Sequence, residues 1–253
     1  MKITIIGTGN VATVFAKLAF AAGNTIVQII GRNEAAGKSL AQKVNANYSD
    51  IENINPTVDI IIIAVADNAI ADIVIKLVPT NAIVVHTAGS VSINVLAHKF
   101  ENYGIIYPLQ SLRKDMETIP EIPLLLEANN ATTYGMLENF SKTISKTVTA
   151  ITENERLHLH TAAVIVNNFT NYLYAEAYQL CQANKINFDL LLPLIKETAN
   201  RVEHASPLEM QTGPAKRNDT VTIDKHLTLL EKYPSIKSVY AFLSDKILGM
   251  YKK

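Results

Sequence analysis

Two glycines that directly follow the first apolar strand constrain this chain more than any other feature. Residues 2–6 read Lys-Ile-Thr-Ile-Ile, and the run Gly7-Thr8-Gly9-Asn10-Val11-Ala12 comes next. A strand, the pattern G-x-G-x-x-A and an apolar helix are how a dinucleotide-binding βαβ unit begins. The glycines permit a tight turn and a close backbone approach to a pyrophosphate, and the helix N-terminus supplies free N–H groups. We therefore predict that Gly7–Val11 binds a nucleotide diphosphate; a purely structural turn is the weaker interpretation.

The composition limits the classes of protein to which this chain can belong. Its 253 residues allow one large domain or two smaller ones, and 48% of them are hydrophobic, which is enough for a core. The net charge of zero gives no reason to expect a nucleic acid or a membrane as partner. The single Cys181 and the absence of a leader pattern favour a cytoplasmic protein. No metal-site, phosphate-loop or nucleophile-elbow motif occurs.

Strand and helix patterns alternate through the first part of the chain, which predicts an α/β doubly wound Rossmann-like domain. The run Asp59–Val65 is apolar without alternation, as expected of a parallel strand buried on both faces. Strands are expected at 2–6, 25–30, 59–65, 82–86, 104–107, 123–127 and 147–151, and helices at 10–22, 34–44, 67–77 and 132–145. Only helical patterns follow, at 153–184, 188–203, 219–230 and 236–248. We predict an NAD(P)-binding domain over residues 1–152 and an all-α domain for substrate and dimerisation over residues 153–253.

The end of the second strand favours NADP over NAD. An NAD site places Asp or Glu there to accept hydrogen bonds from the ribose hydroxyls. This chain has Arg32 and Asn33 instead, whose guanidinium and amide suit a 2′-phosphate, with Lys38 one turn further on. A solvated surface arginine is the alternative. We predict NADP(H) as the cofactor, with NAD less favoured.

Two further strand ends are expected to border the nicotinamide half, because ligands lie beyond the carboxyl ends of parallel strands. The first is Ala64-Val65, followed by Asp67, which is equally well explained as a helix N-cap. The second is His86-Thr87-Ala88-Gly89-Ser90, whose small residues leave room for a ring. For His86, a satisfied histidine at a strand end is as good an interpretation as contact with a ligand.

The first long helix carries a polar stripe. No charged residue occurs from Thr161 to Ala175, so we expect this stretch to be buried on nearly all sides. At 100° per residue one face holds His160, Asn167, Asn171, Tyr174 and Tyr178, opposite an apolar face. Because buried amides need partners, the stripe faces a polar cavity or another chain. Pairing in a core or a dimer interface explains it as well as catalysis does.

A later loop, residues 211–219, combines a Gly-Pro turn with polar side chains between two helices, which is typical of a pocket-lining loop. Arg217 suits a substrate carboxylate. Asp219 is better explained as a helix cap than as a catalytic group.

Five segments together resemble one known family. They are Gly7-Thr8-Gly9-Asn10-Val11-Ala12, His86-Thr87-Ala88-Gly89-Ser90, Tyr107-Pro108-Leu109-Gln110-Ser111, His160 through Asn171, and Gln211-Thr212-Gly213-Pro214 with Arg217-Asn218-Asp219. In this order they look like Rossmann-like proteins that carry the helical domain of unknown function 2520. The resemblance implies an NADP oxidoreductase with a 6-phosphogluconate-dehydrogenase-like helical domain, through which such proteins commonly dimerise. Wider relatives include pyrroline-5-carboxylate reductase, ketopantoate reductase and the β-hydroxyacid dehydrogenases.

One departure from these relatives bears on the chemistry. The hydroxyacid dehydrogenases and ketopantoate reductase use a catalytic lysine on the first long helix, and this chain has none between residues 161 and 175. His160 is then the conventional proton donor on the stripe, with Asn167 and Asn171 to hold the substrate oxygen or nitrogen and Arg217 as anion anchor. We predict an NADP(H)-dependent reductase of a small carbonyl or imine compound, acting as a homodimer. The alternatives are an NADP-binding sensor or scaffold and a flavin- or deazaflavin-linked reductase.

Overall fold

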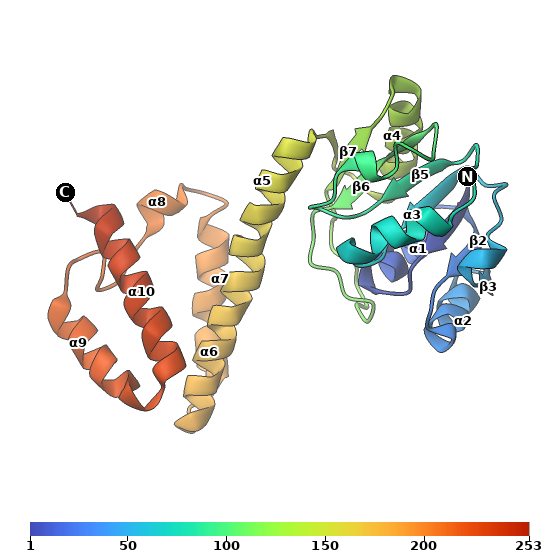
Figure 1. Cartoon of the computed structure of the whole chain (residues 1–253). Coiled ribbons are helices and arrows are strands. Elements are labelled where there is room, and N and C mark those ends of the chain that lie inside the picture. The colour runs from blue at the N-terminus through green and yellow to red at the C-terminus, as the bar shows by residue number, and fades with distance from the viewer. Residues whose placement is uncertain (253) are drawn as a thin grey trace. The chain divides into compact units, whose positions relative to one another are not determined.

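A computed structural model describes residues 1–252, which divide into two compact units, residues 1–167 and residues from Asn168 onward (Figure 1). The change from mixed strands and helices to helices alone falls where it was expected, because the last strand ends at Ala150 and the next helix begins at Glu153. The two units divide later, inside a continuous helical stretch. The domain boundary at residue 152 therefore stays a prediction.

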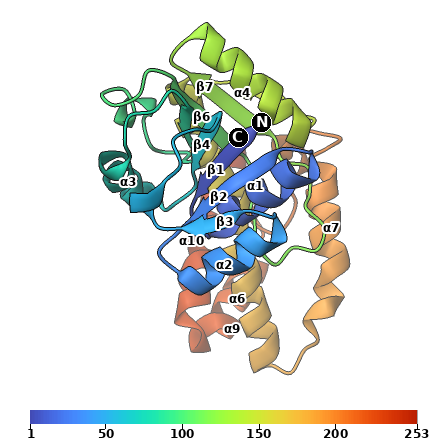
Figure 2. The same cartoon turned by 90° about the vertical axis from the view of Figure 1, so that its right-hand side faces the viewer.

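The first unit is built on one eight-stranded sheet with the order β3-β2-β1-β4-β5-β6-β7-β8. Figure 2 labels β3, β2, β1, β4, β6 and β7 in this order. The strands are β1 (Lys2–Ile6), β2 (Thr25–Ile30), β3 (Asn47–Ser49), β4 (Ile60–Ile63), β5 (Ile83–His86), β6 (Tyr103–Pro108), β7 (Leu124–Ala128) and β8 (Val148–Ala150). The helices of this unit are α1 (Asn10–Ala21), α2 (Glu34–Lys43), α3 (Ile70–Lys76), α4 (Ala131–Ile144) and α5 (Glu153–Ala163). The predicted α/β Rossmann-like class is confirmed.

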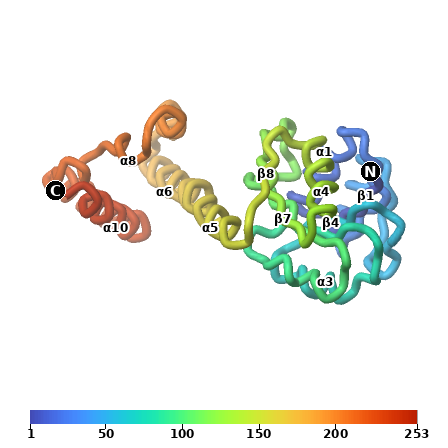
Figure 3. The backbone as a smooth tube through the Cα atoms, turned by 90° about the horizontal axis from the view of Figure 1, so that it is seen from above, coloured from blue at the N-terminus to red at the C-terminus, as the bar shows by residue number. Residues whose placement is uncertain are grey.

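Apolar strands buried between two helical layers hold this unit together. All four residues of β4 are isoleucine and all are buried. Isoleucine is β-branched and therefore favours the strand conformation. One face of the sheet packs against α1, α2 and α4, and the other packs against α3 (Figure 3). Each face has its own apolar cluster, so the sheet is covered on both sides, as its unbroken hydrophobic strands require.

Two details of the sheet differ from the expectation. Strand β3 was not expected, because its sequence Asn-Tyr-Ser carries no apolar run. Strand β7 pairs antiparallel with β6, whereas the other six pairings are parallel. The connection between β6 and β7, residues 109–123, contains no helix, so it lacks the usual helical crossover of a parallel pairing.

The backbone stays helical from Glu153 to Ala183 and includes a π-helical turn at Val164–Phe169. A wider turn interrupts the regular 100° progression, so the polar stripe predicted on that spacing does not continue in phase past residue 164. The second unit contains α6 (Thr170–Ala183), α7 (Leu192–Arg201), α8 (Pro207–Met210), α9 (Thr220–Leu229) and α10 (Pro234–Tyr251). None of the helices within residues 1–252 is long and apolar enough to cross a membrane.

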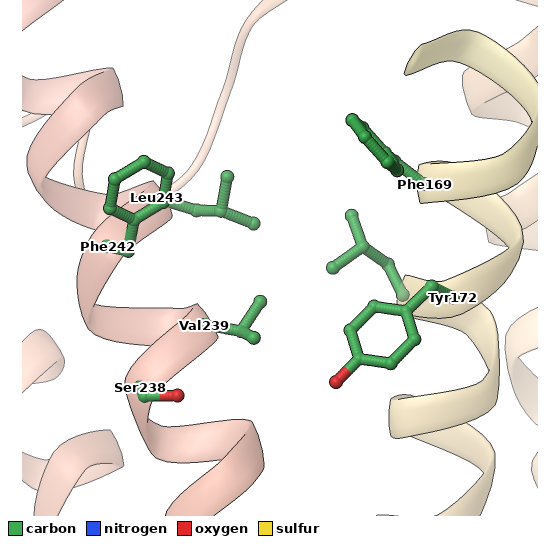
Figure 4. A pocket seen from close by; sticks show the side chains of 7 residues that line it. Phe169, Tyr172, Ser238, Val239, Phe242 and Leu243 are labelled. Carbon is green, nitrogen blue, oxygen red and sulfur yellow. The ribbon is translucent and has the colours of Figure 1, made fainter. Parts of the chain in front are cut away.

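The burial expected from Thr161 to Ala175 is wrong for the single chain. Val166 is 71% exposed, Phe169 is 58% exposed, and Asn167 and Asn171 are also exposed. Within the second unit, α6 and α10 enclose an apolar groove of about 540 Å³, lined by Phe169, Tyr172, Leu173, Ser238, Val239, Phe242 and Leu243 (Figure 4). Absence of charge in this stretch therefore does not reflect burial within one chain.

Candidate functional site

The turn between β1 and α1 lies where the sheet order reverses. Strands β2 and β4 flank β1, and crossovers run in opposite directions from this point, which is where ligands bind in open α/β sheets. Gly7 has a φ of +131°, and a Cβ built on it would lie 2.1 Å from the carbonyl oxygen of Ala64. Only glycine fits there. The turn after β1 and the end of β4 are thereby held in direct contact.

The N-terminus of α1 is open to a ligand. A Cβ built on Gly9 would meet no atom within 4 Å, and Gly9 and Asn10 are exposed. The residue before each of α2, α4 and α5 caps a backbone N–H of the helix with its side chain. The residue before α1 is Gly9, which has no side chain to do so. The first N–H groups of α1 are thus available to an anion.

The loop after β2 presents Arg32 at the surface. Within residues 1–252 the guanidinium of Arg32 makes no hydrogen bond or ion pair, while Asn33 accepts the Ala36 N–H at 2.9 Å and caps α2. The amide N–H groups of Asn33 stay available. Lys38, expected to add positive charge, lies 2.6 Å from the carboxylate of Glu34, which offsets that charge. Arg32 is therefore the main cation of this loop.

The ends of β4 and β5 meet at the same edge of the sheet, as expected for parallel strands. Ala64, Thr87 and Ala88 are buried and Val65 is half-buried, so contact with a ligand there falls largely to the backbone. Asp67 does not cap a helix; its carboxylate accepts the Ser90 hydroxyl proton at 2.5 Å and so joins the two loops.

His86 is fully buried rather than presented to the surface. Its Nδ1 accepts the Ala88 N–H at 3.2 Å, and its Nε2 is buried without a hydrogen bond in the described chain. Burial lowers the pKa of His86 from 6.5 to about 4, and the positive charge of Arg156 contributes to this lowering. The backbone of Ser92 and the negative charges of Asp67 and Glu153 oppose this shift. The ring is neutral near pH 7 and supports the loop through Nδ1.

His160 lies over this loop, near the end of α5. Its Nδ1 is 2.8 Å from the hydroxyl of Tyr107, one residue before the end of β6, and the two rings pack edge to face with centroids 5.7 Å apart. A Cβ built on Gly89 would lie 2.6 Å from His160 Nδ1. Gly89 therefore allows the histidine ring to approach the backbone after β5.

Arg156, one turn before His160, is a residue that the sequence analysis missed. Although charged, it is 1% exposed. Its guanidinium donates to the carbonyl oxygens of Ala88 at 3.2 Å and Gly89 at 2.7 Å, and to the carboxylate of Glu127 at 3.4 Å. Burial raises the pKa of Glu127, and the charge of Arg156 opposes that rise. A lone arginine on a helix carries no sequence signal for such a role.

The remaining predicted residues lie at the end of the first unit or in the second unit. Asn167 is the last residue of the first unit, and Asn171 and Arg217 belong to the second unit, where Arg217 is exposed. Asp219 accepts the Thr222 N–H at 3.1 Å and caps α9, which confirms that interpretation. The catalytic roles of Asn167, Asn171 and Arg217 stay predictions.

Comparison with known proteins agrees with the geometry of the two units. Residues 2–90 match the family model "NADP oxidoreductase coenzyme F420-dependent", and residues 122–247 match the domain of unknown function 2520. A solved structure of a putative NADP oxidoreductase from Bacteroides fragilis is 38% identical, with 98% of each chain covered and a TM-score of 0.93. The chain belongs to the DUF2520 family of Rossmann-like proteins. The family resemblance inferred from the sequence motifs is confirmed.

More distant structures share the fold. Protein TM1727 from Thermotoga maritima is 20% identical, with 99% of this chain and 100% of that chain covered and a TM-score of 0.81. A reductive aminase from Aspergillus terreus, solved with NADPH and ethyl levulinate, is 15% identical, with 97% and 92% covered and a TM-score of 0.71. No curated protein matches the sequence.

The residues of this family member fit a pyridine nucleotide. Gly9 leaves space for a diphosphate at the uncapped start of α1, and the unpaired Arg32 lies in the loop where the adenosine ribose is bound in this fold. The buried, small residues after β4 and β5 offer a backbone-lined edge for a flat ring. Within residues 1–252, no group of three or more potential metal ligands occurs, so no metal site is apparent there.

We predict that His86 makes stability depend on pH. Its folded-state pKa of about 4 lies below the value of 6.5 for an unperturbed ring, so its contribution is full above pH 6.5 and is lost as the pH falls toward 4. His86→Asn keeps an acceptor for Ala88 but removes the titration. Between pH 7 and pH 4 the wild type should lose up to about 3 kcal/mol more free energy of unfolding than the variant.

The measurement is urea unfolding at several pH values, with the exposed His98→Asn as control. The control should follow the wild-type profile. Parallel profiles for His86→Asn and the wild type would contradict the assignment.

Proposed function

We propose that this protein is an NADP(H)-dependent reductase of a small imine or carbonyl compound. The observation that carries the proposal is the combination at one sheet edge of an open, uncapped helix start, an unpaired Arg32 and a histidine over the loop after β5. The family model that matches residues 2–90 describes NADP oxidoreductases, which supports the cofactor class. The aminase that shares the fold supports the imine alternative by analogy alone.

Different residues of this chain would bind the cofactor, supply the proton and orient the substrate. When bound, the reduced nicotinamide supplies a hydride. The backbone at Gly7–Val11 holds the diphosphate, Arg32 and Asn33 bind the 2′-phosphate, and the segments Ala64-Val65 and His86-Thr87-Ala88 border the nicotinamide. His160 supplies the proton that the reduced atom needs. Asn167, Asn171 and Arg217 orient the substrate from the helical region.

A sensor or scaffold that binds NADP without turnover is the second candidate, favoured by the absence of a lysine between residues 161 and 175. A flavin- or deazaflavin-linked reductase would carry a coloured group on purification. Screening the protein with NADPH against cyclic imines and keto acids separates the first two functions, because only the reductase oxidises NADPH in the presence of a substrate.

Arg32→Ala should weaken NADPH binding about tenfold to a hundredfold and leave NADH binding within about twofold, because a charge-assisted bond to the 2′-phosphate is lost. Isothermal titration calorimetry measures both affinities. Lys43→Ala, which removes an exposed cation at the other end of α2, is the matched control and should change neither. Equal losses for NADPH and NADH would contradict the 2′-phosphate role.

His160→Ala should lower kcat by about 10² to 10⁴, the usual contribution of a general acid, while the Kd of NADPH changes little. The reason is that the ring approaches the loop after β5 and not the phosphate turn. The exposed His158→Ala, two residues away, is the control and should keep wild-type kcat. Loss of NADPH binding in His160→Ala would instead point to a role in the cofactor site.

We also propose that the protein is a cytoplasmic homodimer formed through its helical unit. Large apolar side chains exposed there, such as Phe242 at 60% and Val221 at 63%, exceed the isolated exposure that a monomer tolerates. The apolar groove between α6 and α10 belongs to the same surface (Figure 4). A second copy is the occupant that the family resemblance favours.

Phe242→Asp should shift the protein toward monomer, because it puts a charge on that apolar surface. Sedimentation equilibrium measures the mass, and Ile75→Asp, at an exposed position on α3, is the control. A wild-type protein that is monomeric at all concentrations, or a Phe242→Asp variant as dimeric as the wild type, would argue against this interface.

A further inference from the structure

Tyr107 and His160 come from distant parts of the first unit and meet at the sheet edge that borders the proposed nicotinamide site. Tyr107 lies one residue before the end of β6 and is 7% exposed, whereas His160 lies near the end of α5 and is half-buried. The Tyr107 hydroxyl and His160 Nδ1 are 2.8 Å apart. Within residues 1–252, His160 Nε2 makes no hydrogen bond and is not among the buried polar atoms. Nε2 is therefore the ring nitrogen left to meet a ligand.

Three separate features hold this pair in place. Gly89 leaves the space that the His160 ring occupies, since a Cβ there would lie 2.6 Å from Nδ1 and 3.1 Å from the Tyr107 ring. The buried guanidinium of Arg156 fixes the Gly89 carbonyl at 2.7 Å and lies one helical turn from His160. Burial of the tyrosine fixes its hydroxyl. A chance contact between exposed side chains would need neither the space at Gly89 nor the hydrogen bond from Arg156 nor the burial of Tyr107.

Resting on the proposed reductase function, we propose that Tyr107 is the positioning residue of His160, and that Nε2 of His160 gives the proton to the atom of the substrate that is reduced. Neither the composition nor the spacing of the sequence assigns this role to Tyr107. The tyrosine acts through the histidine, as a hydrogen-bonded partner fixes the tautomer and orientation of a functional imidazole elsewhere.

The hydrogen bond selects which nitrogen carries the mobile proton. When the ring is neutral, Tyr107 donates its O–H to Nδ1, so the ring proton is on Nε2. When the ring is protonated, Nδ1–H donates to the Tyr107 oxygen and Nε2–H is again free. Burial raises the pKa of Tyr107, with Asp67 adding to and Arg156 opposing that rise, so the phenol stays protonated.

In the proposed reduction, NADPH is the reductant and His160 is the proton donor. The substrate carbon gains a hydride from NADPH, and NADPH is thereby oxidised to NADP⁺. The π electrons of the C=N or C=O bond move to the nitrogen or oxygen atom. That atom takes the proton as the Nε2–H bond of the charged ring breaks. The ring is left transiently neutral with its proton on Nδ1, where it donates to the Tyr107 oxygen. Solvent then protonates Nε2 to restore the charged ring, and loss of the Nδ1 proton to solvent returns the resting Nε2–H tautomer with Tyr107 as donor.

The first test needs no substrate. In the full-length protein labelled with ¹⁵N-histidine, the ring signals of His160 are identified by their loss in His160→Ala. The neutral ring should be the Nε2–H tautomer with Nδ1 as acceptor. Tyr107→Phe, which keeps the aromatic ring, should shift the Nδ1 signal and admit the other tautomer. Tyr103→Phe, at the opposite end of β6, is the matched control and should leave the His160 signals unchanged.

The second test is a double-mutant cycle in the reduction assay. Tyr107→Phe should lower kcat about tenfold with the Kd of NADPH unchanged, and adding it to His160→Ala should lower kcat no further. Multiplied effects would show that Tyr107 acts independently and would overturn the proposal, as would ring signals of His160 that Tyr107→Phe does not alter. A wild-type protein with the expected tautomer that reduces no substrate would retain the pairing and reject the reductase function.

Discussion

The close approach of Gly7 to the carbonyl oxygen of Ala64 is the constraint on which the sheet edge at the ends of β1 and β4 depends. It ties the turn after β1 to the end of β4 at the point where the strand order reverses. A side chain at residue 7 would force these segments apart and displace the start of α1. Because the first N–H groups of α1 have no side-chain cap, the same geometry that packs the sheet also leaves hydrogen-bond donors for an anion.

The buried charge of Arg156 holds the loop after β5, as the close approach at Gly7 holds the turn after β1. Arg156 carries its guanidinium from α5 to the carbonyl oxygens of Ala88 and Gly89, and Glu127 balances its charge. Removing water from a guanidinium costs several kcal/mol unless its donors are used. The three acceptors receive hydrogen bonds from the two terminal nitrogens, whereas Nε is buried without a partner within residues 1–252. The loop after β5 is thereby fixed to α5, and His160 on that helix is held over Gly89.

The sequence predicted the parts of this protein that follow from local patterns. Unbroken apolar strands and the glycine pair were sufficient to predict the α/β sheet and the tight turn that leads into α1. Strand β3 lacks an apolar run, and the antiparallel pairing of β7 depends on a connection without a helix, so neither had a local signal. The π-helical turn at Val164–Phe169 shifts the phase of a helix whose composition reads as regular. Burial of Arg156 depends on partners far away in sequence, which a single sequence does not reveal.

Burial and hydrogen bonding distinguish the two histidines near the ends of β5 and β6. His86 is closer to the sheet, yet burial and Arg156 lower its pKa to about 4, and its Nδ1 is committed to the loop backbone. A neutral, enclosed ring is a poor acid near pH 7, because giving up its remaining N–H proton would leave a buried anion. His160 keeps one nitrogen bonded to Tyr107 and the other accessible, so it is both oriented and able to exchange its proton. The environment of His86 fits a supporting ring, and that of His160 fits the role of proton donor that we propose for it.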